Sequence, residues 1–183
     1  ALIKTLENNT LRTVRNRAIF YVMLGCGLRR AEVCDLKVKQ VSLKSRSAKI
    51  IGKGNKERTI YFPEPVQNVL KNWLELRQLN KGVIDTGFVF GRIDNKQCLH
   101  LNSPLDPSSV TRIIEKLVAE TENLEGRFTP HDLRRTFATR LISKNVDIVE
   151  VQKLMGHASV ATTGNYVRKD EENLRMAAEK VEL

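Results

Sequence analysis

Four side chains near the C-terminal end of the sequence could together carry out chemistry on a phosphodiester. They are His131, Arg134, His157 and Tyr166, in the segments TPHDLRRTFATRL and LMGHASVATTGNY. A phenol can act as a nucleophile, an imidazole can pass a proton, and a guanidinium can donate to two phosphoryl oxygens. The group therefore predicts a site that holds a phosphodiester and attacks it.

Thr129 and Pro130 are typical of an N-cap and a first helical residue, and they predict a helix over 130–143. His131 and Arg134 would then lie on one face of its first turn, where unpaired backbone N–H groups and the helix dipole favour an anion. Taken alone, this pair is a common chance pattern and an exposed arginine usually faces solvent. The pair of His131 and Arg134 indicates a catalytic site only because other reactive side chains lie nearby in the sequence.

A second guanidinium, Arg29, follows the glycine-flanked end of an earlier helix in the segment GCGLRRAEV. A side chain that emerges from such a turn can reach a site without crowding by its own helix. Glu32, three residues later, could orient Arg29 as a supporting residue. Arg29 and Arg134 acting from two sides could neutralise the charge on a phosphorane, so we expect neither a metal ion nor another cofactor.

The composition favours a polyanionic partner. The chain has 183 residues, a net charge of +10 and a pI near 9.7. Basic side chains gain by displacing counterions condensed on nucleic acid, although many basic proteins are merely soluble. The sequence has no apolar run of about 18 residues and no signal stretch, which predicts a cytoplasmic protein that does not bind membranes. The cysteine pattern predicts free thiols, since it holds no C-x-x-C pair.

The hydrophobic pattern predicts a mainly α-helical protein with a small antiparallel β-sheet, in one domain spanning residues 1–183. Two strands should form a hairpin whose glycine-flanked tip carries Lys53. A tail helix is expected within residues 170–183. The expected helices are 10–24, 30–36, one from Pro65, one from Pro107, 130–143 and 148–154, the last ended by Gly156; the expected strands are 38–43, 47–51 and 57–62.

Four segments of the sequence resemble the signature boxes of the tyrosine recombinases, the phage-integrase family. They are GCGLRRAEV, IIGKGNKERTIYF, TPHDLRRTFATRL and LMGHASVATTGNYV, in the family's order and over about residues 12–170. The nine-residue step from His157 to Tyr166 matches as well. The resemblance implies the catalytic-domain fold of that family. It also implies that the parent protein carries an upstream core-binding domain, absent from this fragment.

The resemblance implies a role for each candidate residue. Tyr166 would be the nucleophile, with Arg29 and Arg134 as phosphate clamps. Lys53 would be the general acid, His131 an acid–base partner near the nucleophile, and His157 a hydrogen-bond donor to a nonbridging oxygen. Arg135 stands where the family often has histidine, and it is given no catalytic role.

The implied activity is that of a site-specific DNA recombinase, a DNA strand transferase. Attack by Tyr166 on double-stranded DNA would leave a 3′-phosphotyrosyl bond and a free 5′-hydroxyl, without metal or ATP. Other recombinase protomers would be partners in a tetrameric synapse, in a prokaryotic or phage setting near the nucleoid. Two alternatives remain, a type IB topoisomerase-like nicking-closing enzyme and a catalytically idle DNA-binding module. The tail could dock on a neighbouring protomer or on its own domain.

Overall fold

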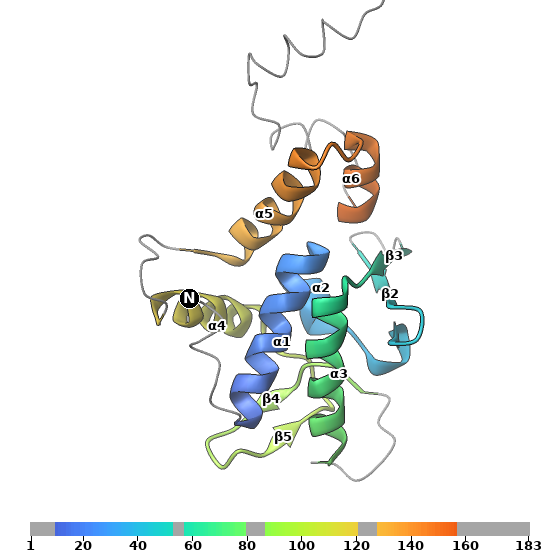
Figure 1. Ribbon diagram of the computed structural model, residues 1–183. Coiled ribbons are helices and arrows are strands. Elements are labelled where there is room, and N and C mark those ends of the chain that lie inside the picture. The colour runs from blue at the N-terminus through green and yellow to red at the C-terminus, as the bar shows by residue number, and fades with distance from the viewer. Residues whose placement is uncertain (1–9, 53–56, 80–86, 121–127, 157–183) are drawn as a thin grey trace, which may run out of the picture.

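The computed structural model describes residues 10–52, 57–79, 87–120 and 128–156. Their helices form a main body around α1 (Leu11–Cys26), with α5 (Pro130–Ser143) and α6 (Ile148–Met155) above it in Figure 1. The main body also contains α2 (Arg30–Asp35), α3 (Glu64–Leu79) and α4 (Pro107–Ala119). This arrangement agrees with the mainly helical fold predicted from the sequence.

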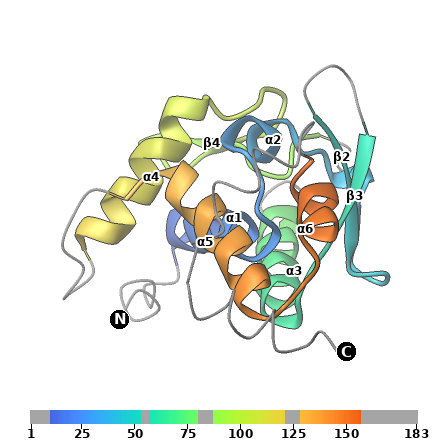
Figure 2. The same ribbon diagram turned by 90° about the horizontal axis from the view of Figure 1, so that it is seen from above.

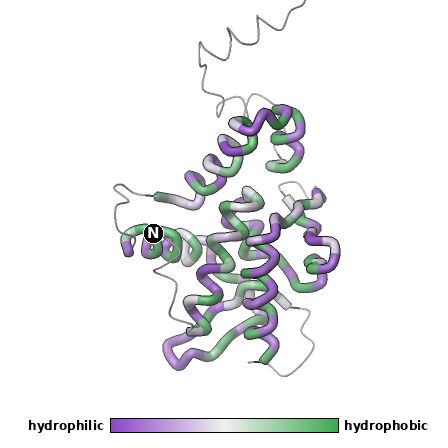
Figure 3. Tube along the Cα trace, in the orientation of Figure 1, coloured by the Kyte–Doolittle hydropathy of each residue, from purple (hydrophilic) through white to green (hydrophobic). Residues whose placement is uncertain are grey.

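The helix α1 is the centre of the main body. It buries Ala18, Ile19, Val22 and Met23 completely, and it contacts both α3 and α5. Apolar and polar stretches alternate along α1 and α3 in Figure 3, as expected for helices with one buried face. In the view from above, α5 lies across α1 (Figure 2), and these two helices are in contact.

Two small antiparallel sheets flank the helices. The first has the order β1-β2-β3, with β1 (Val41–Ser42), β2 (Ser47–Ile51) and β3 (Glu57–Tyr61). Ile51 of β2 pairs with Glu57 of β3, so the predicted hairpin of these two strands is confirmed, and Lys53 lies outside the described residues. The second sheet pairs β4 (Arg92–Ile93) with β5 (Leu99–His100), and it was not predicted from the sequence.

The predicted boundaries hold for most elements, and two were wrong. The helix expected over 10–24 continues through Gly25 to Cys26, and Gly27 caps it with a left-handed φ of 63°. Of the strand expected over 38–43, residues Val38–Gln40 instead form a 3₁₀ helix, in which the Lys37 backbone N–H donates to Gln40 Oε1 at 2.7 Å. The predicted tail helix lies outside the described residues.

A second, smaller apolar cluster joins α5 and α6. Ala138, Val151 and Met155 are fully buried in it, and partly buried side chains such as Phe137 surround them. Phe137 also packs against Gly27 of the main body, where an added Cβ would come within 2.4 Å of its ring. This contact fixes the turn that follows α1 against α5, and both the turn and α5 are close in sequence to candidate site residues.

Candidate active site

Arg29 stands at the N-cap of α2, with extended backbone angles of φ −73° and ψ 151°. Its Nη1 donates to Glu32 Oε1 at 2.9 Å and its Nη2 donates to the Gly156 carbonyl at 3.1 Å. The Arg29 backbone N–H donates to Glu32 Oε2 at 2.8 Å. Its side chain is 37% exposed, so Arg29 is held by fixed partners and still reaches solvent.

Arg134, on α5, is buried beneath the same region and is only 4% exposed. Its Nη2 donates to the Met155 carbonyl at 2.6 Å, and its Nη1 donates to the Gly27 carbonyl. One guanidinium therefore connects the end of α1 with the end of α6. A guanidinium has five N–H donors, so it can hold carbonyls with some of them and a phosphoryl oxygen with another.

His131 is exposed in the first turn of α5, as the sequence predicted. The turn is fixed by Asp132, whose Oδ2 accepts hydrogen bonds from the Thr129 hydroxyl at 2.7 Å and the Thr129 backbone N–H at 2.9 Å. The hydroxyl bond is the main reason that the pKa of Asp132 lies below its ordinary value. Asp132 therefore stays ionised and adds negative charge where the helix dipole favours it.

Arg58, on β3, is a site residue that was not predicted from the sequence. Its Nη1 and Nη2 each donate to one oxygen of the Glu32 carboxylate at 2.8 Å, and its Nε donates to the Leu154 carbonyl at 3.1 Å. One feature of the sequence could have indicated that Arg58 faces the protein interior. Arg58 precedes the buried Ile60 by two residues, so the two side chains lie on the same face of the strand.

The three arginines bind consecutive carbonyls at the C-terminal end of α6. Arg58 binds the carbonyl of Leu154, Arg134 that of Met155 and Arg29 that of Gly156. The last carbonyls of a helix have no partner within the helix and carry negative partial charge, which cations neutralise. The end of α6 thus brings together three positively charged side chains, one each from the N-cap of α2, from β3 and from α5.

Glu32 provides the balancing negative charge. Its burial would raise the pKa of the carboxyl, but hydrogen bonds from Arg58 and from the Arg29 backbone outweigh that effect and hold the pKa below its ordinary value. The carboxylate is therefore ionised at neutral pH. With Arg29 and Arg58 it forms a group of net charge +1, which suits an anion better than an uncharged site would.

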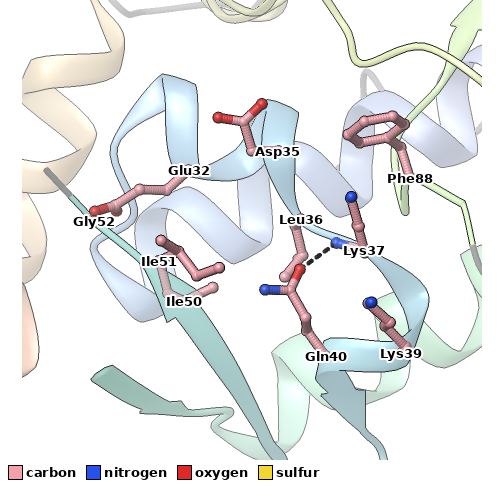
Figure 4. A pocket seen from close by; sticks show the side chains of 10 residues that line it. All are labelled: Glu32, Asp35, Leu36, Lys37, Lys39, Gln40, Ile50, Ile51, Gly52 and Phe88. Carbon is pink, nitrogen blue, oxygen red and sulfur yellow. Dashed lines mark hydrogen bonds between the residues drawn. The ribbon is translucent and has the colours of Figure 1, made fainter. Parts of the chain in front are cut away.

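A hollow of about 470 Å³ opens beside Glu32, between α2, the 3₁₀ turn and the end of β2. Figure 4 shows Glu32 next to Gly52, with Lys37 and Phe88 on the opposite wall. The Lys37 ammonium lies 5.4 Å from the centre of the Phe88 ring. Because Gly52 directly precedes Lys53 in the chain, the hollow adjoins the end of β2, where the connection expected to carry the general acid begins.

Three of the predicted catalytic residues lie outside the described residues: Lys53, His157 and Tyr166. The structure fixes the chain on either side of Lys53, because β2 ends at Ile51 and β3 begins at Glu57. It also fixes the residue before His157, because Gly156 closes α6 in a left-handed conformation with φ 61°. Among the described residues, no group of three or more His, Cys, Asp or Glu side chains could hold a metal ion.

Comparison with known proteins agrees with this geometry. The description of the phage integrase family matches residues 1–173. The chain belongs to the phage integrase family. The tyrosine recombinase XerA of Pyrococcus furiosus is 34% identical over 171 residues, covering 93% of this chain and 56% of that protein.

Solved structures of the family share the fold. A crystal structure of XerA recombinase aligns with a TM-score of 0.77 and 28% identity, covering 100% of this chain and 63% of that one. The XerH site-specific recombinase, in a pre-cleavage complex with its difH substrate, aligns with a TM-score of 0.74 and 26% identity, covering 99% of this chain and 52% of that one. The predicted fold class and family are thereby confirmed, and the chain spans 52–63% of these relatives.

Within the described residues, no helix has the length and apolar character needed to cross a membrane.

Proposed function

We propose that this chain is the catalytic domain of a site-specific DNA recombinase that cleaves and rejoins DNA through Tyr166. The observation that carries the proposal is the convergence of Arg29 and Arg134 on the end of α6, immediately before His157. Relatives with this fold include a recombinase bound to its DNA substrate before cleavage. Two guanidinium groups held at one helix end suit a phosphodiester, whose charge increases during nucleophilic attack.

The proposed reaction exchanges one ester for another. Tyr166 Oη attacks the phosphorus, and its proton passes to His131, because a phenol with a pKa of about 10 is a weak nucleophile at neutral pH. The new bond is a 3′-phosphotyrosyl ester. The bond to the 5′-oxygen breaks, and Lys53 supplies the proton that this oxygen needs as it leaves.

The clamps act on the nonbridging oxygens during both steps. Arg29 and Arg134 neutralise the charge that builds up on the phosphorane, and His157 donates a further hydrogen bond. In the reverse direction a 5′-hydroxyl from a partner duplex attacks the phosphotyrosyl ester and releases Tyr166. We therefore expect no requirement for ATP or a divalent ion.

The partners follow from the same reaction. The substrate is double-stranded DNA, and strand exchange requires two duplexes and several protomers. The sequence predicts an apolar side for segment 170–183, and we assign this segment to contacts between protomers; the apolar residues are Leu174, Met176, Ala177, Ala178 and Val181. An isolated catalytic domain should bind DNA mainly through phosphates, so its affinity should fall steeply between about 50 and 200 mM salt.

The test is a trapping experiment on a nicked duplex whose 5′ fragment diffuses away after cleavage. In the presence of EDTA, the unaltered chain should form a covalent adduct with DNA, and Tyr166→Phe should form none. Tyr61→Phe is the matched control, since this exposed tyrosine lies on β3 outside the proposed nucleophile segment. An adduct that persists in Tyr166→Phe would contradict the assignment of the nucleophile.

The trapping assay also separates the alternatives. Supplying a second, marked duplex distinguishes strand exchange from simple religation of the original strand, which a topoisomerase-like enzyme would favour. Failure to form any adduct, together with retained DNA binding, would leave the idle DNA-binding module as the function.

A further inference from the structure

Arg58 is the arginine at the α6 end that the proposed chemistry does not use. Its side chain is 11% exposed, and that of its partner Glu32 is 5% exposed. The pair forms two parallel hydrogen bonds of 2.8 Å, the bidentate geometry in which a guanidinium and a carboxylate interact most strongly. Arg58 and Glu32 are 26 residues apart in the sequence, so this pair joins β3 to α2.

Glu32 is shared between Arg58 and the phosphate clamp Arg29. Each carboxylate oxygen of Glu32 accepts one bond from Arg58 and one from Arg29, at 2.8–2.9 Å. The four bonds fix the plane of the carboxylate, and that plane in turn fixes where the Arg29 guanidinium lies. A change at Arg58 would remove two of these four bonds, and only the Arg29 backbone N–H and the Arg29 Nη1 would then hold the carboxylate.

Arg58 also sets the position of the chain that leaves α6. Its Nε holds the Leu154 carbonyl, and its side chain packs against Gly156, where an added Cβ would lie 3.0 Å from Cδ and 3.1 Å from Nε. Arg29 binds the carbonyl of the same Gly156. The residue after Gly156 is His157, which is assigned a contact with the reacting phosphate.

We propose that Arg58 is a positioning residue for DNA cleavage: through Glu32 it orients the clamp Arg29, and through the end of α6 it places His157. This role rests on the proposed function. Arg58 itself does not contact the phosphate, since its guanidinium is turned into the protein onto Glu32 and Leu154. Arg58 lies on β3, the strand that follows Lys53 in the chain, and it bonds to both α2 and the end of α6. One side chain therefore connects β3, α2 and α6.

The first variant to test is Arg58→Lys, which keeps the charge and removes the bidentate geometry. In single-turnover trapping at saturating DNA, we expect its cleavage rate to fall by roughly ten- to hundredfold, the scale at which a small misplacement slows an active site. The DNA concentration at half-saturation should change by less than about twofold, because the phosphate contacts remain. A cleavage rate equal to that of the unaltered chain would overturn the proposal.

Loss of stability alone must be distinguished from loss of position. Arg77→Lys is the matched control, because Arg77 is 3% exposed and donates to the Phe88 carbonyl at 2.8 Å, on α3 rather than at the α6 end. Both variants are assayed well below their unfolding midpoints. Arg77→Lys should cleave at the unaltered rate, and an equal loss of cleavage in the two variants would overturn the positioning role.

A charge-neutral substrate provides a second, independent readout. A methylphosphonate at the scissile position removes the negative charge that Arg29 neutralises, so a misplaced Arg29 should matter less there. The defect of Arg58→Lys should shrink at least about tenfold on this substrate, as should that of Arg29→Ala. An undiminished defect would contradict the route through Arg29.

If the unaltered chain forms no adduct at Tyr166 on ordinary DNA, the proposed function itself fails, which is a different outcome from a normal rate in Arg58→Lys.

Discussion

Glu32 is the only carboxylate, among the described residues, that binds two of the site's arginines. Its charge is stabilised in the folded protein by Arg58 and Arg29, and its pKa is lowered as a result. In the unfolded chain the pKa returns to its ordinary value near 4.5. Ionised Glu32 therefore contributes stability above that pH, and the contribution is lost as the pH falls toward the lower pKa of the folded state.

Glu32→Gln should reveal this contribution as a pH-dependent difference in stability. At pH 7 the variant should be less stable by about 2 kcal/mol, since charge-assisted hydrogen bonds to a buried group are lost. Below pH 4.5 the difference should shrink, because protonated Glu32 resembles glutamine. Urea unfolding of both proteins between pH 7 and pH 3 measures it. Glu64→Gln, at the exposed start of α3, provides the baseline, and a difference that stays constant with pH would contradict a stabilising role of ionised Glu32.

Local sequence signals made Arg29, Glu32 and Arg134 candidate site residues, and the structure brings their side chains together with that of Arg58, which those signals did not indicate. The glycine turn before Arg29 and the capping residues before His131 act within a few positions of each other, so a pattern in the sequence can predict them. The partners of Arg58 lie 26 and 96 residues away. Nothing close to Arg58 in the chain indicates that β3 and the end of α6 meet, and only the tertiary fold brings them together.

At the scale of elements, Gly27, in the turn between α1 and α2, has three structural roles. Gly27 closes α1 in a left-handed conformation, lies under the ring of Phe137, and offers its carbonyl to Arg134. A side chain there would strain the backbone and push α5 away at the same time. The turn therefore couples the end of α1 to Arg134 on α5.

Gly27→Ala should destabilise the protein by about 3 kcal/mol, of which about 1–2 kcal/mol comes from the left-handed backbone and the rest from displacing Phe137. Asn145→Ala is the matched control, because Asn145 has a φ of 59° and is exposed. It should cost only about 1 kcal/mol, the conformational part. Thermal unfolding compares the two. Equal losses would mean that Phe137 adjusts without cost.

Most of the helices could be predicted because caps and hydrophobic spacing agree at their ends, as at Asp106 before α4 and Asp147 before α6. The sheet of β4 and β5 could not. Each of its strands has two residues, too few to show alternation. The end of α1 was misplaced because Gly25 and Gly27 give the same signal, and only packing decides that Gly25 stays helical against Val66.

At the scale of the whole molecule, the core encloses two of the three thiols. Cys26 and Cys34 are buried and Cys98 is exposed. Burial raises the pKa of both Cys26 and Cys34 to about 12, with Asp35 and Asp106 adding to the effect at Cys34. The thiolate is the reactive form, so the folded core should protect both thiols chemically as well as sterically.

A disulfide reagent at pH 8 should therefore modify Cys98 at once, while Cys26 and Cys34 react only as the main body opens. Cys98→Ser should abolish the fast phase and leave the slow phases unchanged. The slow rates should rise with urea in parallel with unfolding measured by circular dichroism. Fast reaction of all three thiols in the native protein would show that the main body opens far more readily than its packing implies.

The bonds between the end of α6 and its neighbours α2 and β3 have a thermal consequence. Guanidinium groups, carbonyls and a carboxylate make this junction, whereas the core is made of apolar side chains. Exposing polar surface lowers the heat capacity and exposing apolar surface raises it. Separation at this junction should therefore have a small heat-capacity change, and its free energy should vary almost linearly with temperature. The free energy that holds the candidate site together would then change in proportion to temperature, over a range in which the stability of the core follows a curve.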